Sequence, residues 1–331
     1  MKTIAVMTSG GDAPGMNAAL RSVVRAALCY GISVYGIYRG YRGLLDGDLE
    51  ILSSRSVSGI VLRGGTFLKT ARCLEFMESE NQKKAAQILR DKGVDGLVVI
   101  GGDGSVKGAA ALAALGIPTV TVPGTIDNDM HGTDETIGHD TAVNAVVRAV
   151  SAIRDTASAH NRAAIVEVMG RFAGHIALAA GLASGAEYVL IPEIPFSREK
   201  LARSLTKQMK EGRTNSIIIC AEGADDGRAL GEWLRDKTGI DMCVTILGFI
   251  QRGGAPSAHD GILASVLGAA SVKALMEGET GALIGMRRGK VQVIPYEKAW
   301  EDKEPFHSSL YELSNLLGAA QEEEDIRETG L

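Results

Sequence analysis

The chain has 331 residues, 45% of them hydrophobic and 23% charged, a composition typical of a globular protein of roughly two domains. The net charge of −5 argues against nucleic acid as the main partner, and no apolar run reaches the about 18 residues of a membrane span. The cysteines are scattered without a Cys-x-x-Cys motif, and no leader pattern follows Met1. We therefore expect reduced thiols and a cytoplasmic location.

The first predicted strand covers residues 4–8, which read IAVMT. A glycine-rich segment, residues 9–17, follows it and leads into a helical pattern over residues 18–30. A glycine turn that opens a helix can bind phosphate, because free N–H groups and the helix dipole favour an anion. The segment matches neither a Walker P-loop nor the Gly-x-Gly-x-x-Gly fingerprint. Residues 33–38 form the next predicted strand, which favours a parallel, doubly wound sheet.

Residues 39–72 are rich in Gly, Arg and Ser, and they place Arg63 and Arg72 beside flexible backbone. Arginine is suited to clamping phosphate oxygens, because its fork of donors is always charged. The alternative for each of these arginines is a solvated surface position.

The central stretch, residues 97–105, reads LVVIGGDGS. Its apolar residues predict a buried parallel strand, and its glycines predict a sharp turn that lets backbone approach a ligand. We expect Ser105 to cap a helix over residues 106–115. Asp103 lies within this anion site, so we predict a Mg²⁺ ion that bridges its carboxylate to phosphate oxygens. For this loop alone, an ordinary strand-to-helix turn remains the alternative.

A second polar loop follows the predicted strand 118–122 and reads PGTIDND over residues 123–129. It carries Asp127 and Asp129 at the edge where ligands bind in open α/β sheets. One aspartate is suited to take a proton from an attacking hydroxyl while the other orients it or holds the metal. A turn stabilised by Asp and Asn side chains is the alternative.

A second α/β unit follows a boundary near Gly138 and a helix predicted over residues 140–159. Its predicted strands are 164–168, 189–191, 216–220 and 244–247, and its predicted helices are 172–182, 198–210 and 228–237. The chain then returns to the first domain with a helix over residues 260–276.

We therefore predict an α/β protein of two doubly wound, Rossmann-like three-layer domains, with the active site in the cleft between them. The first domain is expected to comprise residues 1–138 and about 252–304, and the second residues 139–251 and about 305–331. The acidic segment 321–325 is expected to be a solvated helix end.

Six segments resemble the bacterial ATP-dependent 6-phosphofructokinases, and the resemblance runs in order over about residues 2–305. They read SGGDAPGMNA, RGGTFL, VVIGGDGS, PGTIDND, VEVMGR and IQRGG. The resemblance implies a glycolytic kinase that transfers the ATP γ-phosphate to the 1-hydroxyl of fructose 6-phosphate with Mg²⁺. It also implies an ATP-binding first domain and a sugar-phosphate-binding second domain.

The resemblance assigns roles to individual residues. Asp127 would be the general base, Thr125 would contact the transferred phosphoryl group and Asp103 would hold Mg²⁺. The catalytic set it implies is Asp127, Thr125, Arg171 and Arg72. The implied ATP site is Gly11, Arg72, Cys73, Gly102, Asp103, Gly104 and Ser105. The implied sugar-phosphate site is Thr125, Asp127, Asp129, Arg162, Met169, Gly170, Arg171, Glu222 and Arg252.

Two glycines bear on the phosphoryl donor. Relatives that use pyrophosphate typically have Asp in place of Gly104 and Lys in place of Gly124. We expect both glycines to leave room for a nucleotide, which predicts ATP as the donor.

The chain departs from this family at two of four expected ligands of the sugar 6-phosphate. Arg162 and Arg252 are present, but Cys243 replaces an arginine and Phe249 replaces a histidine. Each lost charge-assisted contact is worth about 1.5–3 kcal/mol. Three readings are open: compensation by Arg287, Arg288 or Lys290, a different sugar or sugar phosphate, or a nucleotide-binding regulatory paralogue.

The resemblance also implies a cytoplasmic homotetramer, with Arg162 reaching into a neighbouring subunit and an effector pocket for ADP or phosphoenolpyruvate. Arg21, Arg25, Arg154 and Glu187 match that pocket. Ser54, Gly59 and Glu211 replace charged residues expected there. Because Glu211 would repel an anionic effector, we predict weak or altered allosteric control.

Overall fold

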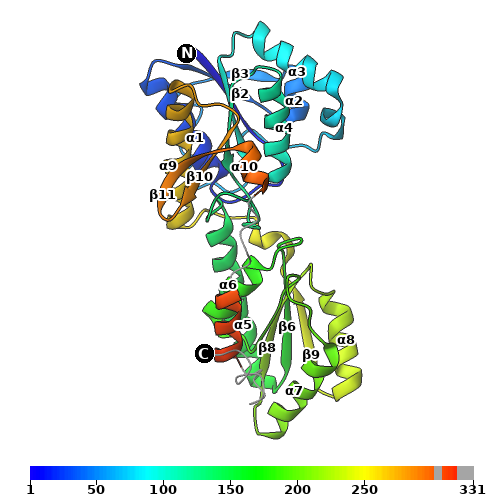
Figure 1. The fold of residues 1–331 in the computed structure, drawn as a ribbon. Coiled ribbons are helices and arrows are strands. Elements are labelled where there is room, and N and C mark those ends of the chain that lie inside the picture. The colour runs from blue at the N-terminus through cyan, green and yellow to red at the C-terminus, as the bar shows by residue number, and fades with distance from the viewer. Residues whose placement is uncertain (302–307, 319–331) are drawn as a thin grey trace. The chain divides into compact units, whose positions relative to one another are not determined.

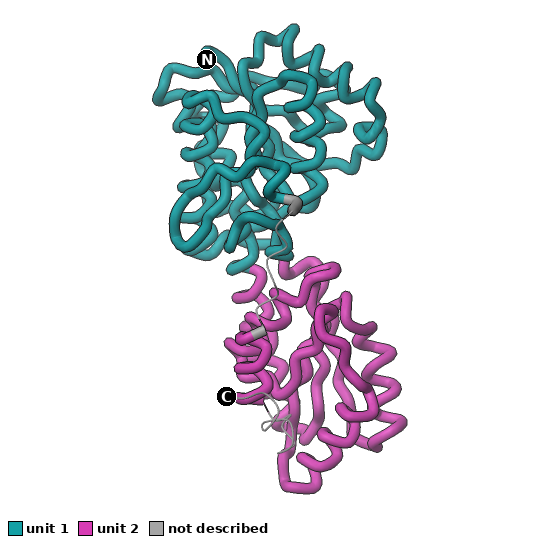
Figure 2. Tube along the Cα trace, in the orientation of Figure 1, with its two compact units in different colours: residues 1–141, 252–304 teal, residues 142–251, 305–331 magenta. Residues whose placement is uncertain are grey.

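The computed structural model describes residues 1–301 and 308–318, so the acidic segment 321–325 lies outside the described residues. The chain divides into two compact units, shown in different colours in Figure 2. Unit 1 comprises residues 1–141 and 252–304, and unit 2 comprises residues 142–251 and 305–331. Each unit is a sheet covered by helices, which confirms the predicted pair of α/β domains.

Unit 1 is built on a seven-stranded sheet in the order β11-β10-β5-β4-β1-β2-β3. The bounds are β1 (Thr3–Thr8), β2 (Ser33–Ile37), β3 (Leu49–Leu52), β4 (Gly96–Gly101), β5 (Thr119–Pro123), β10 (Ala282–Arg287) and β11 (Lys290–Pro295). The strands from β10 to β2 are parallel, and the two edge strands β3 and β11 are antiparallel to their neighbours. The carboxyl ends of β1, β4 and β5 therefore meet at one edge.

Helices cover both faces of this sheet (Figure 1). On one face α1 (Met16–Cys29) packs along α9 (Ala258–Met276), so the helix predicted to return to the first domain does so. On the other face lie α2 (Gly40–Asp46), α3 (Ser79–Asp91) and α4 (Asp103–Ala114). The short helices η1 (Leu74–Met77) and α10 (Tyr296–Glu301) complete the unit.

Unit 2 is built on a parallel sheet in the order β7-β8-β6-β9. Its strands are β6 (Ala163–Val168), β7 (Tyr188–Leu190), β8 (Ser216–Ala221) and β9 (Met242–Ile246). Its helices are α5 (His139–His160), α6 (His175–Ser184), α7 (Arg198–Lys210), α8 (Gly227–Thr238), η2 (Gly248–Gln251) and α11 (Ser308–Leu317), with α5 beginning at the end of unit 1. Leu201, Leu205, Leu230 and Leu234 bury α7 and α8 against the sheet.

Several boundaries differ from those predicted. Helix α4 begins at Asp103 with Gly102 as its N-cap, so Ser105 lies inside the first turn and does not cap the helix. Helix α6 begins at His175, later than predicted, because Gly170 and Arg171 adopt positive φ angles of 142° and 55° in a turn. Among the residues that the structure describes, no helix is long and apolar enough to cross a bilayer.

Candidate active site

Three loops meet at the carboxyl edge of the unit 1 sheet, one each after β1, β4 and β5. The backbone N–H of Ser9 donates to the carbonyl of Ile100 at 2.9 Å, and that of Gly124 donates to the carbonyl of Gly101 at 3.0 Å. These bonds continue the parallel pairing past the strand ends and bring the predicted phosphate loops side by side.

Close packing explains why glycines are needed here. A Cβ at Gly101 would lie 2.5 Å from Oγ of Ser105 and 2.5 Å from the carbonyl oxygen of Ser9. A Cβ at Gly102 would lie 3.6 Å from Cβ of Thr125, so the loops after β4 and β5 are in contact. Ser105 is buried, and its carbonyl accepts a hydrogen bond from the hydroxyl of Tyr41 at 2.6 Å. Gly101 thus allows the close approach of the loops after β1 and β4, and Gly102 lies beside Thr125.

Asp103 is the first residue of α4, where free N–H groups and a carboxylate share the helix N-terminus. Its carboxylate pairs with the ammonium group of Lys107 at 2.6 Å, and the Asp103 side chain is 47% exposed. An accessible single carboxylate at a helix N-terminus fits Mg²⁺, which is usually held by one or two carboxylates together with substrate phosphates.

The two glycines expected to leave room for the nucleotide have different surroundings. A Cβ at Gly104 would meet nothing within 4 Å, so the space beside α4 is open at that position. A Cβ at Gly124 would lie 3.1 Å from Cε of Met16 and 3.2 Å from Cγ2 of Ile100. At Gly124 a side chain would have to shift these neighbours slightly, so its surroundings are packed, and the expectation that it leaves room for the nucleotide stays a prediction.

The loop after β5 gives its two aspartates different surroundings. Asp127 is 4% exposed, and its backbone N–H donates to Oγ1 of Thr125 at 3.2 Å. Asn128 follows with a φ of 51° and donates its side-chain amide to the carbonyl of Asp134. Asp129 is exposed to solvent. The two aspartates therefore differ in burial, and a hydrogen bond to Thr125 holds the backbone of the buried one.

Arg252 lies against the loop after β1. Its Nη1 donates to the carbonyl of Asp12 at 3.3 Å, and a Cβ at Gly11 would lie only 2.2 Å from the same nitrogen. The Nε of Arg252 has no hydrogen-bond partner among the described residues. The structure thus places this predicted sugar-phosphate ligand beside the predicted ATP loop. Arg72 is exposed at the start of η1, and Cys73 packs against the core of unit 1.

In unit 2 the predicted sugar-binding residues cluster after β6. The backbone N–H groups of Gly170 and Arg171 donate to Oε1 of Glu222 at 3.2 and 2.8 Å. The N–H of Met169 donates to Oε1 of the fully buried Gln251 at 3.2 Å. One carboxylate and one amide therefore hold the turn in place, and the side chain of Arg171 is exposed.

The remaining predicted phosphate ligands lie near the edge strand β9. Nε of Arg162 pairs with the carboxylate of Asp241 at 2.6 Å. Cys243 is exposed on β9, and Phe249 is 81% exposed on η2. Because cysteine and phenylalanine carry no positive charge, neither position can pair with a phosphate as an arginine or histidine would. The compensating candidates Arg287, Arg288 and Lys290 lie on the β10–β11 hairpin of unit 1.

The predicted effector residues fall in both units. Arg154 pairs with Glu187 at 3.0 Å, and Arg213 pairs with the same carboxylate at 3.0 Å. Arg21 and Arg25 lie on α1 in unit 1. Glu211 is exposed at the end of α7.

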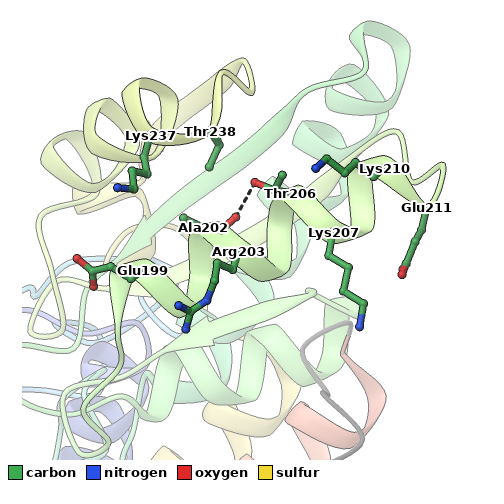
Figure 3. Close-up of a pocket in the computed structure, with 9 residues that line it drawn as sticks. All are labelled: Glu199, Ala202, Arg203, Thr206, Lys207, Lys210, Glu211, Lys237 and Thr238. Carbon is green, nitrogen blue, oxygen red and sulfur yellow. Dashed lines mark hydrogen bonds between the residues drawn. The ribbon is translucent and has the colours of Figure 1, made fainter.

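A groove of about 730 Å³ lies between α7 and α8 in unit 2. Figure 3 shows its lining, with Arg203, Lys207 and Lys210 on α7 and Lys237 on α8. Its lining residues are Glu199, Ala202, Arg203, Thr206, Lys207, Lys210, Glu211, Lys237 and Thr238, so it contains none of the predicted catalytic residues.

Sequence reasoning missed several residues that hold the site. They are Asp12, His139, Arg213, Asp241, Gln251 and Asp260. The pattern Ser257-x-x-Asp260 is a helix-start signal that could have drawn attention to Asp260. The other contacts join segments distant in sequence and have no local signal.

Residues 3–275 match the family model described as Phosphofructokinase. The chain belongs to the phosphofructokinase family. This confirms the resemblance that the six motifs carry. Among curated relatives of this phosphofructokinase, ATP-dependent 6-phosphofructokinase 1 of Clostridium perfringens is 51% identical over 317 residues, or 96% of this chain and 99% of that protein. The ATP-dependent 6-phosphofructokinase of Paenibacillus macquariensis is 50% identical over 318 residues, again 96% of this chain and 99% of that protein.

Solved structures agree with this assignment. The phosphofructokinase resembles that of Saccharomyces cerevisiae with a TM-score of 0.84 and 39% identity, over 97% of this chain and 48% of that longer chain. It resembles the Pichia pastoris phosphofructokinase in the T-state with a TM-score of 0.86 and 37% identity, over 95% of this chain and 37% of that one.

Proposed function

We propose that the chain is an ATP-dependent 6-phosphofructokinase of glycolysis, which transfers the γ-phosphate of ATP to the 1-hydroxyl of fructose 6-phosphate and forms fructose 1,6-bisphosphate. The observation that carries the proposal is the contact between Gly102 and Thr125, which brings a phosphate-binding helix start next to the loop of a buried aspartate. Relatives about half identical over nearly the full chain, named for this activity, support it.

Asp127 acts as the general base in this proposal and takes the proton of the attacking hydroxyl. Thr125 contacts the transferred phosphoryl group, and Asp129 lies beside the base. The backbone at residues 102–105 and Arg72 bind the ATP phosphates, and Gly11 and Cys73 line the nucleotide site. Phosphoryl transfer needs such positioning and charge neutralisation more than covalent chemistry.

The proposed metal is Mg²⁺, held by Asp103. When bound, the ion neutralises charge on the phosphate oxygens. Lys107 pairs with only one oxygen of this carboxylate, and because both side chains are exposed, giving up that pair would cost little.

The sugar is held by the turn after β6, through Met169, Gly170 and Arg171, with Glu222 fixing that turn. Arg162 and Arg252 bind the sugar phosphate, and catalysis also uses Arg171. A kinase for a different sugar or sugar phosphate is the second candidate, because the exposed Cys243 and Phe249 bring no charge to the phosphate.

The assembly belongs to the same proposal. We propose a cytoplasmic homotetramer, with an active site that Arg162 of a neighbouring subunit completes. The effector pocket uses Arg21, Arg25, Arg154 and Glu187. Its response is weak or altered, because Glu211 presents a negative charge and Arg213 already pairs with Glu187. A clear shift of the activity curve by ADP or phosphoenolpyruvate would contradict the last point.

The test is a steady-state kinase assay with ATP and Mg²⁺ against fructose 6-phosphate, tagatose 6-phosphate, sedoheptulose 7-phosphate and fructose, with pyrophosphate as control donor. Saturable turnover of fructose 6-phosphate at low concentration is the expected result. Preference for another sugar would show that Cys243 and Phe249 reset specificity, and no turnover with any sugar would favour a regulatory subunit.

The substitution Asp127→Asn separates an enzyme from a binding protein. We expect kcat to fall by about 10²–10⁴-fold while ATP binding measured by calorimetry persists, since the base acts only on the hydroxyl. An Asp127→Asn protein with wild-type turnover would refute the assigned base.

A further inference from the structure

Asp260 is a buried carboxylate in the first turn of α9 that no part of the proposed mechanism uses. It is 0% exposed. Its Oδ1 accepts from the backbone N–H of Gly138 at 2.8 Å, and its Oδ2 accepts from the N–H of Thr141 at 2.8 Å and from the Thr141 hydroxyl. Burial raises the pKa of Asp260, and the bonds from Thr141 and Gly138 act in the opposite direction. The carboxylate is thus fully engaged with a segment distant in sequence.

Helix α9 does not need this carboxylate for its own start. The side chain of Ser257 caps the helix by accepting from the backbone N–H of Asp260. The oxygens of Asp260 instead satisfy N–H groups at the start of α5, where a carboxylate is favoured by the helix dipole. Asp260 therefore fixes residues 136–141, which we call the brace segment.

The brace segment lies directly on the loop that carries Asp127. The hydroxyl of Thr136 donates to the carbonyl of Thr125 at 2.7 Å, and the N–H of Ile137 donates to the carbonyl of Pro123 at 3.0 Å. Nδ1 of His139 bonds the carbonyl of Ile126 at 2.8 Å.

The base loop is therefore held through the carbonyls of residues 123, 125 and 126. The last of these carbonyls belongs to the peptide unit whose N–H is that of Asp127, so His139 fixes the peptide next to the proposed base.

We propose that Asp260 is a positioning residue for Asp127 that acts through the brace segment. It touches no substrate. By anchoring Gly138 and Thr141 it keeps Thr136 and His139 on the carbonyls of the base loop, and so keeps the carboxylate of Asp127 at the reacting hydroxyl. The inference rests on the proposed function in taking Asp127 as the base.

The substitution Asp260→Asn tests this. One oxygen becomes an amide donor that faces a backbone N–H, so the brace segment loses an anchor. We expect kcat to fall by about tenfold to a hundredfold while KM for ATP stays within about twofold, because a small misplacement of a reacting group is costly and the ATP loops are untouched. Amide hydrogen exchange at Asp127 and Ile137 should also accelerate, and this readout requires no turnover.

The matched control is Asp95→Asn. Asp95 lies in the same unit and accepts hydrogen bonds from two backbone N–H groups, those of Lys2 and Thr3, but it lies at the opposite ends of the strands. This control should lower stability without lowering kcat. The inference is overturned if the two variants have the same kcat and the same rates of amide exchange at Asp127 and Ile137.

A second pair of variants decides the matter if Asp260→Asn does not fold. His139→Leu removes the donor to Ile126, whereas His139→Asn offers a side-chain N–H close to the same place. The inference predicts loss of kcat in the first variant and substantial recovery in the second. Wild-type kcat in both would overturn it. Failure of the proposed function looks different, because the wild type itself would then turn over none of the sugars, and failure of the assigned base would leave Asp127→Asn with wild-type activity.

Discussion

At the residue scale, Gly104 is a place where a single side chain can test the phosphoryl donor. It lies in the first turn of α4, next to the proposed Mg²⁺ ligand Asp103, and it has open space where a Cβ would stand. A new side chain there would point into the space assigned to the nucleotide and would disturb no packing.

We predict that Gly104→Asp lowers the affinity for ATP by at least about tenfold, because a fixed negative charge would face the phosphates. Gly104→Ala is the matched control: it should keep ATP binding and stabilise the protein by about 0.5–1 kcal/mol, since alanine is favoured over glycine in a helix. Calorimetric titration with ATP and urea unfolding measure the two effects. Equal loss of ATP affinity in both variants would show that bulk, not charge, matters at this position.

A second residue-scale prediction concerns Cys220. Burial raises the pKa of its thiol from 9.0 to about 12, with the nearby carboxylate of Asp225 as the next cause. At pH 8 iodoacetamide should label the exposed Cys29 and Cys243 in the folded protein, and Cys220 only after unfolding. Mass spectrometry of the labelled peptides reads this directly.

The raised pKa of Cys220 also predicts how the stability of the protein depends on pH. Because the folded state holds the Cys220 proton more tightly than the unfolded state, its contribution is full below pH 9 and is lost as pH rises toward 12. The stability difference between wild type and Cys220→Ala should therefore shrink as pH rises from about 9 to 11. Urea unfolding across this range measures it, and a constant difference would contradict the shift.

At the element scale, the turn after β6 depends on an acceptor supplied by the end of β8. The N–H of Glu222 donates to the carbonyl of Val168 at 2.9 Å, and its carboxylate accepts from Gly170 and Arg171. Two neighbouring parallel strands thus build one sugar-binding turn.

We predict that Glu222→Ala raises KM for the sugar phosphate by about tenfold or more, since two N–H groups lose a charged acceptor worth roughly 1.5–3 kcal/mol. KM for ATP should change little, because the ATP loops belong to unit 1. Glu222→Gln keeps one oxygen acceptor, so its KM for the sugar phosphate should lie between those of the wild type and Glu222→Ala. Equal rises in both KM values would instead indicate a general loss of structure.

At the scale of the whole molecule, each unit has a buried core of its own among the residues that the structure describes. Leu112 is fully buried in the core of unit 1, and Leu205 is fully buried in that of unit 2, where Cys220 also lies. Each core should therefore support its own unit.

We predict that Leu205→Ala lowers the free energy of the opening that exposes Cys220 by about 2–5 kcal/mol. Leu112→Ala makes the same chemical change in unit 1 and should lower the free energy of this Cys220-exposing opening far less. The rate of Cys220 alkylation in moderate urea measures both. Equal effects of the two variants would mean that the units open together.

The parts of the fold that local pattern determines were predictable. Apolar runs ending in glycine identified β1, β4 and β5, and amphipathic spacing identified α7 over its full length. The antiparallel edges were not predicted: Leu49–Leu52 lies in a Gly- and Arg-rich stretch without a clear alternating pattern. Positive φ angles at Gly170 and Arg171 delayed the start of α6, because backbone conformation in a turn overrode helix propensity.

The candidate site, like the fold, has parts that local sequence predicts and parts that it does not. Asp103 and Asp127 could be singled out because their chemistry shows in short motifs at strand ends. The pairing of Glu222 with Gly170, of Arg252 with Asp12 and of Asp260 with Gly138 joins residues far apart in the chain. Such pairs follow from the tertiary structure, and a single sequence carries no signal for them. The contacts around Gly124 have this origin too, since only the tertiary packing brings Met16 next to it.

The split of unit 1 into two stretches of chain has a consequence during synthesis. Strand β5 pairs with β10, which the ribosome produces only after all of residues 142–251 have been made. Until then β5 is an open parallel edge whose residues are buried in the finished protein, and such edges invite pairing with other nascent chains. Unit 2, whose sheet comes from one continuous stretch, can complete that sheet first, so slow or interrupted translation in residues 252–281 would prolong the exposure of the β5 edge.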